Sequence, residues 1–213
     1  MKIDLLGESA LILRELGVPA HELANWINDR RSAGVVEAIA SYDTIGVYFD
    51  ARSFQVGELE QTVAAFEPPE LSVPKRHEIP VCYELGEDLI EVAKRLKLSP
   101  LEVVHLHCGQ TYSCFAVGFC PGFAYLGHLP DALSGLPRRP EPRVRVTPGS
   151  VAITGSQTAV YPLERPGGWH IIGRTPLQLV DIVQAYFPIT AGDEIAFLPI
   201  PLTDFERLEG SRL

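Results

Sequence analysis

Several motifs that mark common enzyme classes are absent from this sequence. It contains no G-x-x-x-x-G-K-[ST] phosphate loop, no G-x-G-x-x-G dinucleotide fingerprint, no G-x-S-x-G nucleophile elbow and no H-E-x-x-H zinc motif. These absences exclude an ATPase of the common kind that is complete in one chain. The single methionine is Met1, so the Ala-Met-Lys-Met site that carries biotin is also absent, and any biotin must arrive on another chain.

Positive charge is also scarce. The 213 residues include 18 Lys and Arg against 27 Asp and Glu, and the resulting net charge of -9 removes the electrostatic attraction that dominates nucleic-acid binding. Near the N-terminus, Asp4, Glu8 and Arg14 interrupt the apolar run that a signal peptide or a membrane span needs. We therefore expect a soluble, cytoplasmic protein that binds neither nucleic acid nor membrane.

The cysteines and histidines do not show metal-site spacing. The 4 cysteines form no C-x-x-C pair, and we interpret them as small, reduced, hydrophobic residues. The run 105–108, His-Leu-His-Cys, lacks the spacing of three or four that places two ligands on one helical face, so we predict no metal site. His107 is the best candidate for a general base, because a helix C-terminus favours its protonated form. A purely structural histidine is the alternative.

The first third of the chain alternates strand and helix signals. Apolar runs typical of strands flank two turns, at 7–9 and at 41–43, and each pair of runs is followed by a segment with helical spacing. The apolar residues of the two helices are Leu23, Trp26 and Ile27, and Val56, Leu59, Val63 and Phe66. This order predicts an α+β N-terminal domain over residues 1–76. The proline-rich segment 67–78 is the predicted linker.

Residues 77–213 predict a mostly β domain that starts with a strand and two helices. Ile79, Val81 and Tyr83 alternate on one face of the strand. Asp88 is predicted to cap the first helix, and a capping box at 99–102 begins the second. From residue 111 onward helix signals vanish, and short apolar runs separated by Pro and Gly turns are typical of a barrel or a sandwich. These runs are TYSCFAVGF, RVRVT, SVAIT, TAVYP, WHIIG and EIAFLP.

Two turn-rich loops of this domain carry candidate binding groups. In the first, 118–127, Phe123 and Tyr125 can wall a pocket, although aromatic rings equally often fill a core. The second, 136–150, gathers arginines whose planar forks suit carboxylate or phosphate oxygens. A solvated edge strand or a salt-bridged subunit contact is the alternative for them. These arginines are Arg138, Arg139, Arg143 and Arg145.

The third loop, 154–175, disperses polar residues among glycines. Backbone amides in such turns can form an anion-binding concavity, and Gly167 and Gly168 permit close approach of a ligand or another chain. Two tight hairpin turns are the alternative. The polar residues are Gln157, Thr158, Tyr161, His170, Arg174 and Thr175.

The longest of these segments resemble a known family. GFCPGFAYLGHLP from Gly118 and LPRRPEPRVRVTPGSVAITGSQTAVYPLERPGGWHIIGRT from Leu136 are similar to the B subunit of 5-oxoprolinase. This family is also called allophanate hydrolase subunit 1, or the sporulation kinase-inhibitor family. The resemblance implies a ferredoxin-like fold for residues 1–76 and a cyclophilin-like β-barrel for residues 77–213.

The resemblance also implies a function. The chain is expected to be a non-autonomous subunit of an ATP-dependent 5-oxoprolinase, which hydrolyses a cyclic amide. Its expected partners are a larger subunit homologous to allophanate hydrolase subunit 2 and a third 5-oxoprolinase subunit. ATP with Mg²⁺ is expected to bind mainly to the partner, because the marked loops contain few carboxylates. The alternatives are an inhibitor of a sporulation-type histidine kinase and a carboxyltransferase-like subunit of a urea carboxylase or allophanate system.

The site residues follow from matching these motifs residue by residue. The expected catalytic residues are His107 and Arg143. The expected substrate- or nucleotide-binding residues are Tyr125, Gly149, Gln157, Thr158, Gly167, Gly168 and Arg174.

Overall fold

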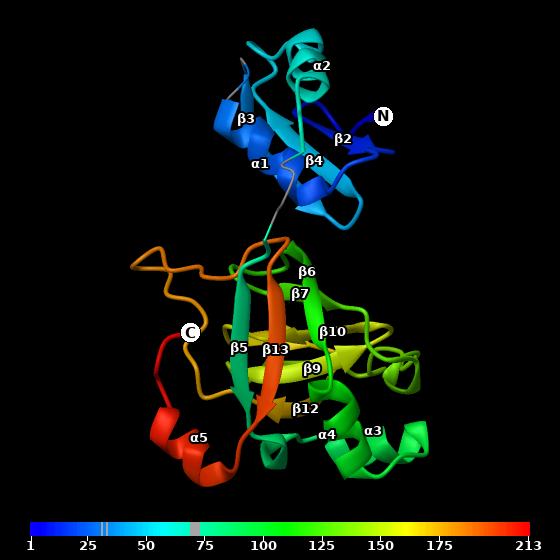
Figure 1. Cartoon of the computed structure of the whole chain (residues 1–213), viewed down its shortest axis with the longest axis vertical. Helices are drawn as coiled ribbons and strands as arrows, with labels where there is room; N and C mark the ends of the chain where they lie inside the picture. The colour runs from blue at the N-terminus through cyan, green and yellow to red at the C-terminus, as the bar shows by residue number, and fades with distance from the viewer. Residues whose placement is uncertain (31, 33, 69–72) are drawn as a thin grey trace. The chain divides into compact units, whose positions relative to one another are not determined.

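The computed structural model describes residues 1–30, 32, 34–68 and 73–213. The chain divides into two compact units, Met1–Val73 and Pro74–Leu213 (Figure 1). The predicted linker is too long at its C-terminal end, because a strand of the second unit already begins at Arg76. Positions 69–72 of that linker lie outside the described residues.

The N-terminal unit combines an antiparallel sheet with two helices. Its strands are β1 (Lys2–Leu5), β2 (Ala10–Arg14), β3 (Val35–Ser41) and β4 (Thr44–Phe49), and its helices are α1 (Ala20–Arg30) and α2 (Val56–Ala64). Within it β2 pairs with β1 and β4, and β4 pairs with β3. These elements confirm the predicted runs, because apolar residues such as Leu11, Ile27 and Leu59 are buried in its core. The ferredoxin-like topology stays a prediction.

The C-terminal unit is mostly β. Its strands are β5 (Arg76–Val81), β6 (Thr111–Val117), β7 (Ala124–Gly127), β8 (Arg143–Val146), β9 (Ser150–Thr154), β10 (Gln157–Val160), β11 (Arg165–Gly167), β12 (His170–Arg174) and β13 (Glu194–Pro199). Pairing gives the order β5-β13-β6-β7-β10-β9-β12, in which β5 and β13 run parallel and the other neighbours antiparallel. Strands β8 and β11 form a separate antiparallel pair.

The two ends of this strand order meet at one point. Cys82, directly after β5, and Arg174, at the end of β12, exchange backbone hydrogen bonds of 2.8 and 3.0 Å. The mostly β class predicted for this part of the chain is therefore confirmed. The cyclophilin-like barrel implied by the resemblance stays a prediction.

Helical elements flank the sheet of the C-terminal unit. They are the short 3-10 helices η1 (Tyr83–Leu85) and η2 (Asp131–Leu133) and the α-helices α3 (Leu89–Leu96), α4 (Pro100–Cys108) and α5 (Leu202–Leu208). The capping box of α4 is confirmed, since Glu102 N–H donates to Ser99 Oγ at 3.2 Å and Ser99 N–H donates to Glu102 Oε2 at 2.7 Å. The prediction that helices end before residue 111 is wrong for α5. This helix has 7 residues and buries Phe205, too short a pattern to show helical periodicity.

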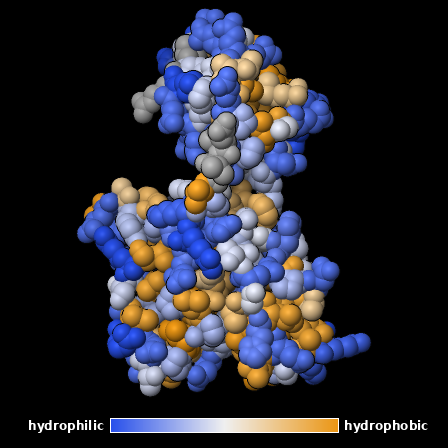
Figure 2. Space-filling model, in the orientation of Figure 1, coloured by the Kyte–Doolittle hydropathy of each residue, from blue (hydrophilic) through white to orange (hydrophobic). Residues whose placement is uncertain are grey.

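The core of the C-terminal unit lies between its sheet and its helices. Ile79, Val81 and Tyr83 share one buried face, as predicted, and pack with Val92 of α3 and Val103 of α4. Hydrophobic side chains also remain on the surface of this unit (Figure 2). Across the residues that the structure describes, no helix combines the length and the hydropathy needed to cross a bilayer.

Candidate functional site

The three turn-rich loops of the C-terminal unit meet in a pocket with a volume of about 170 Å³. The pairing of β7 with β10 and of β8 with β11 brings together segments that are far apart in the sequence. The pocket is lined by Phe119, Phe123, Tyr125, Arg138, Pro142, Tyr161, Pro166, Gly167, Gly168 and Trp169. Three of the predicted site residues, Tyr125, Gly167 and Gly168, are among them. Tyr125 lies on strand β7, within a segment that the sequence indicated as loop.

Phe123 is the centre of the aromatic wall. Its ring centroid lies 5.0 Å from Tyr125, 5.1 Å from Tyr161 and 5.6 Å from Trp169, and all three contacts are edge-to-face. Phe123, Tyr161 and Trp169 are buried, whereas Phe119 at the rim is 59% exposed. Interlocked edge-to-face contacts fix the ring orientations, so this wall is preorganised for a ligand.

Backbone atoms form another part of the wall. A Cβ atom built at Gly167 would lie 2.3 Å from the Tyr161 hydroxyl oxygen. Any larger residue at position 167 would therefore displace the Tyr161 ring from its packed position. Glycine here keeps the pocket open and lets a ligand approach the main chain.

The two tyrosines of the pocket keep their hydroxyl protons at neutral pH. Burial raises the pKa of Tyr125 and of Tyr161, and the positive charge of Arg138 opposes this rise only in part. Both hydroxyl groups therefore serve as hydrogen-bond donors rather than as bases.

Asp88 anchors the second loop. Its buried carboxylate accepts hydrogen bonds from Arg143 Nη1 and Nη2 at 2.9 and 2.8 Å, from Arg139 Nη1 at 2.8 Å and from the Ile171 N–H at 2.8 Å. Burial alone would raise the pKa of Asp88. The hydrogen bonds from Arg143 and Ile171, with the charges of both arginines, outweigh that effect and lower the pKa. The predicted capping role is wrong, because the Asp88 side chain makes no cap hydrogen bond to α3.

Arg143 is held in an ion-pair network, contrary to the predicted catalytic role. Besides the two bonds to Asp88, its Nε donates to Glu87 Oε2 at 3.1 Å, so all three guanidinium nitrogens are engaged. A side chain occupied in this way has no donor left for a reacting group. The sequence placed the arginine correctly on a strand but could not show that a carboxylate 55 residues away binds it.

His107 lies in the core, outside the pocket. Its side chain is fully buried, with Nδ1 at 2.7 Å from the Tyr83 hydroxyl and Nε2 at 2.8 Å from Thr158 Oγ1. The Thr158 hydroxyl donates its only hydrogen to the Ala152 carbonyl oxygen at 3.1 Å. His107 Nε2–H must therefore donate to Thr158, and Nδ1 accepts from the Tyr83 O–H.

A neutral ring satisfies this whole network. Burial lowers the pKa of His107 to about 3. The prediction of a protonated His107 is therefore wrong, because removal of the ring from water outweighs the attraction of the helix C-terminus. A ring that reaches neither solvent nor the pocket also has no access to a substrate proton, so the predicted general-base role lacks support.

The other predicted residues do not line the pocket. Thr158 is buried beside His107, and Gln157 pairs with Gly127 between β10 and β7. Arg174 Nε donates to a backbone carbonyl at 3.2 Å. Gly149 is needed for packing, because it has a φ of 84° and its Cβ would lie 2.4 Å from a carbonyl oxygen.

The predicted set omits three pocket residues, Arg138, Tyr161 and Trp169. The signal that marks them is their position in the three loops rich in Gly and Pro. That signal identifies the loops but not the side of each loop that faces the cavity, because the loops have no regular periodicity.

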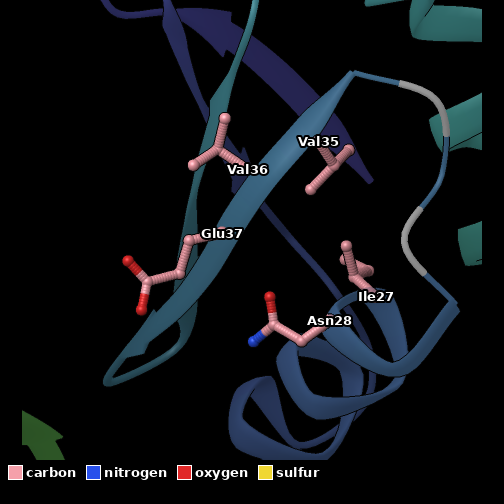
Figure 3. Close-up of a pocket in the computed structure, with 5 residues that line it drawn as sticks. All are labelled: Ile27, Asn28, Val35, Val36 and Glu37. Carbon is pink, nitrogen blue, oxygen red and sulfur yellow. The ribbon is translucent and has the colours of Figure 1, made fainter.

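A larger pocket, of about 390 Å³, lies between α1 and β3 in the N-terminal unit (Figure 3). The Asn28 amide is already engaged there, since Nδ2 donates to the Ala38 carbonyl at 2.8 Å and Oδ1 accepts from the Ala38 N–H at 2.7 Å. The Glu37 carboxylate points away from Ile27 in Figure 3. This pocket offers fewer groups for binding chemistry than the aromatic pocket does.

Comparison with known proteins identifies the family. Residues 1–188 match the family model described as carboxyltransferase domain, subdomain C and D. The chain belongs to this family. Among members of known name, this carboxyltransferase-domain chain is 34% identical to the 5-oxoprolinase B subunit of Bacillus subtilis (strain 168), over 96% of this chain and 95% of that one. It is 40% identical to the 5-oxoprolinase B subunit of Escherichia coli O157:H7, over 92% and 94% respectively. The resemblance predicted from the sequence is confirmed.

Solved structures share the fold of the carboxyltransferase-domain chain. The crystal structure of TTHA0988 has a TM-score of 0.81 and 35% identity, covering 90% of this chain and 40% of that one. The chain thus spans less than half of that longer relative. The urea carboxylase of Kluyveromyces lactis has a TM-score of 0.71 over 97% of this chain and 22% of its own, but the 14% identity shows a common fold alone.

The aromatic pocket of this carboxyltransferase-domain chain does not fit a magnesium ion. Mg²⁺ prefers carboxylate oxygens, and no Asp or Glu is present among the described residues that line the pocket. Within the described part of the chain, no group of three or more His, Cys, Asp or Glu residues is arranged to hold a metal. The donors present, a guanidinium and two tyrosine hydroxyls, instead suit a small ligand with acceptor oxygens.

Proposed function

We propose that this chain is a non-autonomous subunit of an ATP-dependent 5-oxoprolinase, which converts 5-oxo-L-proline, ATP and water to L-glutamate, ADP and phosphate. The observation that carries the proposal is the 34% and 40% identity, over nearly the whole chain, to two proteins named as the B subunit of 5-oxoprolinase. A lactam carbonyl is a weak electrophile. Phosphorylation of its oxygen creates a leaving group that water can displace.

The pocket supports a composite site because it offers binding groups without a proton acceptor. Arg138, Tyr125 and Tyr161 can donate hydrogen bonds, but no described residue of the lining carries a carboxylate or an imidazole. Activation of water needs a base within hydrogen-bond reach of its proton. We therefore place the base and the nucleotide site on the partners, a larger subunit homologous to allophanate hydrolase subunit 2 and a third subunit.

An exposed turn beside the pocket supports docking of a partner. The backbones of Asp181 and Tyr186 exchange hydrogen bonds of 3.0 and 2.8 Å, which close a turn between β12 and β13 that leaves Val183 96% exposed. The turn is rooted on the first pocket loop, since a Cβ atom at Gly122 would lie 2.1 Å from the Val180 side chain. In Figure 1 the segment between β12 and β13 projects from the sheet. Exposed apolar residues near a binding site are typical of an interaction surface.

Reconstitution tests the proposed function. The chain is purified alone and together with both partner subunits, and ATP-dependent release of glutamate from 5-oxo-L-proline is measured. We expect turnover by the complex and none by the chain alone. Robust cleavage by the isolated chain would contradict the composite site, and an inactive complete complex would contradict the function itself.

A pair of surface variants tests the docking turn. Val183→Asp is expected to abolish co-purification with the larger subunit, because it places a charge on an apolar contact. The control is Ile90→Asp on α3, where an apolar side chain is 77% exposed away from this turn. If both variants co-purify like the unmodified chain, the interface lies elsewhere.

A further inference from the structure

Arg138 differs from the other arginines of the second loop. Arg139 and Arg143 lie 2.8 Å from carboxylate oxygens of Asp88, and Arg145 lies 3.6 Å from Glu164. Arg138 lines the pocket and forms no ion pair with any residue in the described part of the chain. A guanidinium is always charged at neutral pH, and its planar fork matches a carboxylate. The pocket therefore presents a positive charge that no described carboxylate neutralises.

The size of the pocket limits what it holds. Its volume of about 170 Å³ is below the roughly 300–1,000 Å³ of pockets that hold drug-sized ligands. A nucleotide, with a purine, a ribose and a chain of phosphates, is too large for this space. A single five-membered ring with one substituent is of suitable size.

The walls of the pocket suit a flat ring with oxygen acceptors. The Tyr125 and Trp169 rings lie with centroids 6.0 Å apart at an interplanar angle of 64°, so they present aromatic surface from two directions. Aromatic faces and edges pack well against a planar amide. The protonated hydroxyl of Tyr125 can donate to a ring carbonyl, and Gly167 and Gly168 allow close approach of the ring to the main chain.

We infer that this pocket binds the lactam substrate itself, a planar five-membered cyclic amide whose carboxylate pairs with Arg138, and that the nucleotide binds elsewhere in the complex. The identity of the lactam rests on the proposed function. Its place in the chain rests on the unpaired Arg138, the small volume and the aromatic walls.

Fluorescence of Trp169 reports on this binding directly. The full chain carries 2 tryptophans, and Trp26 lies in the N-terminal unit, so a Trp26→Phe variant leaves Trp169 as the single reporter. Titrants are 5-oxo-L-proline, 2-pyrrolidinone, which is the same ring without the carboxylate, and ATP. We expect a saturable change with 5-oxo-L-proline below about 10 mM, binding of 2-pyrrolidinone at least about tenfold weaker, and no competition by ATP.

Variants of the arginines isolate the role of the charge. Arg138→Gln is expected to weaken binding of 5-oxo-L-proline at least about tenfold, and Arg138→Lys less than that, because lysine keeps the charge but not the planar fork. Arg145→Gln, in the same loop, is expected to bind normally. The inference is overturned if the chain gives no saturable response to 5-oxo-L-proline, if 2-pyrrolidinone binds equally well, if ATP competes, or if Arg138→Gln binds unchanged.

The assembled complex separates failure of this inference from failure of the proposed function. There, Arg138→Gln should raise KM for 5-oxo-L-proline at least about tenfold and leave KM for ATP unchanged. If the complex cleaves the lactam and this variant keeps its KM, the pocket assignment fails and the function stands. If no lactam is cleaved while the isolated chain still binds the carboxylate ring through Arg138, the function fails and the pocket assignment stands.

Discussion

Replacement of His107 by glutamine tests whether this histidine is structural. Glutamine can donate to Thr158 Oγ1 and accept from the Tyr83 hydroxyl, as the neutral imidazole does, but it does not titrate. Above pH 6.5, the usual pKa of histidine, the two proteins should therefore differ only through packing and hydrogen-bond geometry. We expect the variant to be somewhat less stable there.

The expected pH dependence follows from the pKa of His107. Burial lowers it from 6.5 to about 3, so below pH 6.5 the unfolded chain binds a proton that the folded chain does not. The unmodified protein then loses about 1.4 kcal/mol of stability per pH unit, roughly 3 kcal/mol between pH 6.5 and pH 4. This loss stops below about pH 3, where the folded form also binds the proton. The glutamine variant lacks the effect.

Urea unfolding between pH 4 and pH 7 measures the difference. Trp169 fluorescence in a Trp26→Phe background follows the C-terminal unit, and all other titrating groups cancel because both proteins contain them. We expect the stability advantage of His107 at pH 7 to fall, and to reverse, by about 3 kcal/mol at pH 4. Parallel pH profiles would refute the burial of a neutral ring. A loss of turnover by about 10²-fold or more in a folded His107→Gln complex at pH 7 would instead restore the general-base role.

Two further pairs of variants test the packing and the ion pairs. Gly149→Ala should lower the free energy of unfolding by about 2–4 kcal/mol, because a positive φ is combined with a contact to backbone, whereas Gly118→Ala, with open space around it, should change it by less than about 1 kcal/mol. Arg143→Ala should cost about 3 kcal/mol, since it leaves a buried carboxylate only partly paired, whereas Arg145→Ala, in an exposed pair, should cost at most about 0.5 kcal/mol. Urea unfolding compares each pair, and equal effects within a pair would contradict the reasoning.

Local patterns were sufficient to predict most elements and the family. The capping box at Ser99, the alternation of Ile79 and Val81, and the helical spacing in α1 and α2 each involve residues within a few positions of one another. Elements of 3, 4 and 7 residues, β11, β7 and α5, were missed because they are too short for a periodic pattern. The motifs that carry the family resemblance are also continuous strings, which can be read without a structure.

Tertiary contacts alone decided which residues form the candidate site. Arg138 and Arg143 cannot be distinguished by their local sequence, and the difference arises because Asp88, folded against the second loop from a distant position, binds Arg143 and leaves Arg138 at the pocket. His107 has the local setting of a protonated residue, yet burial between distant elements keeps it neutral. Charge pairing and removal from water depend on neighbours far along the chain, so a sequence specifies the side chains that are available and the fold specifies their chemistry.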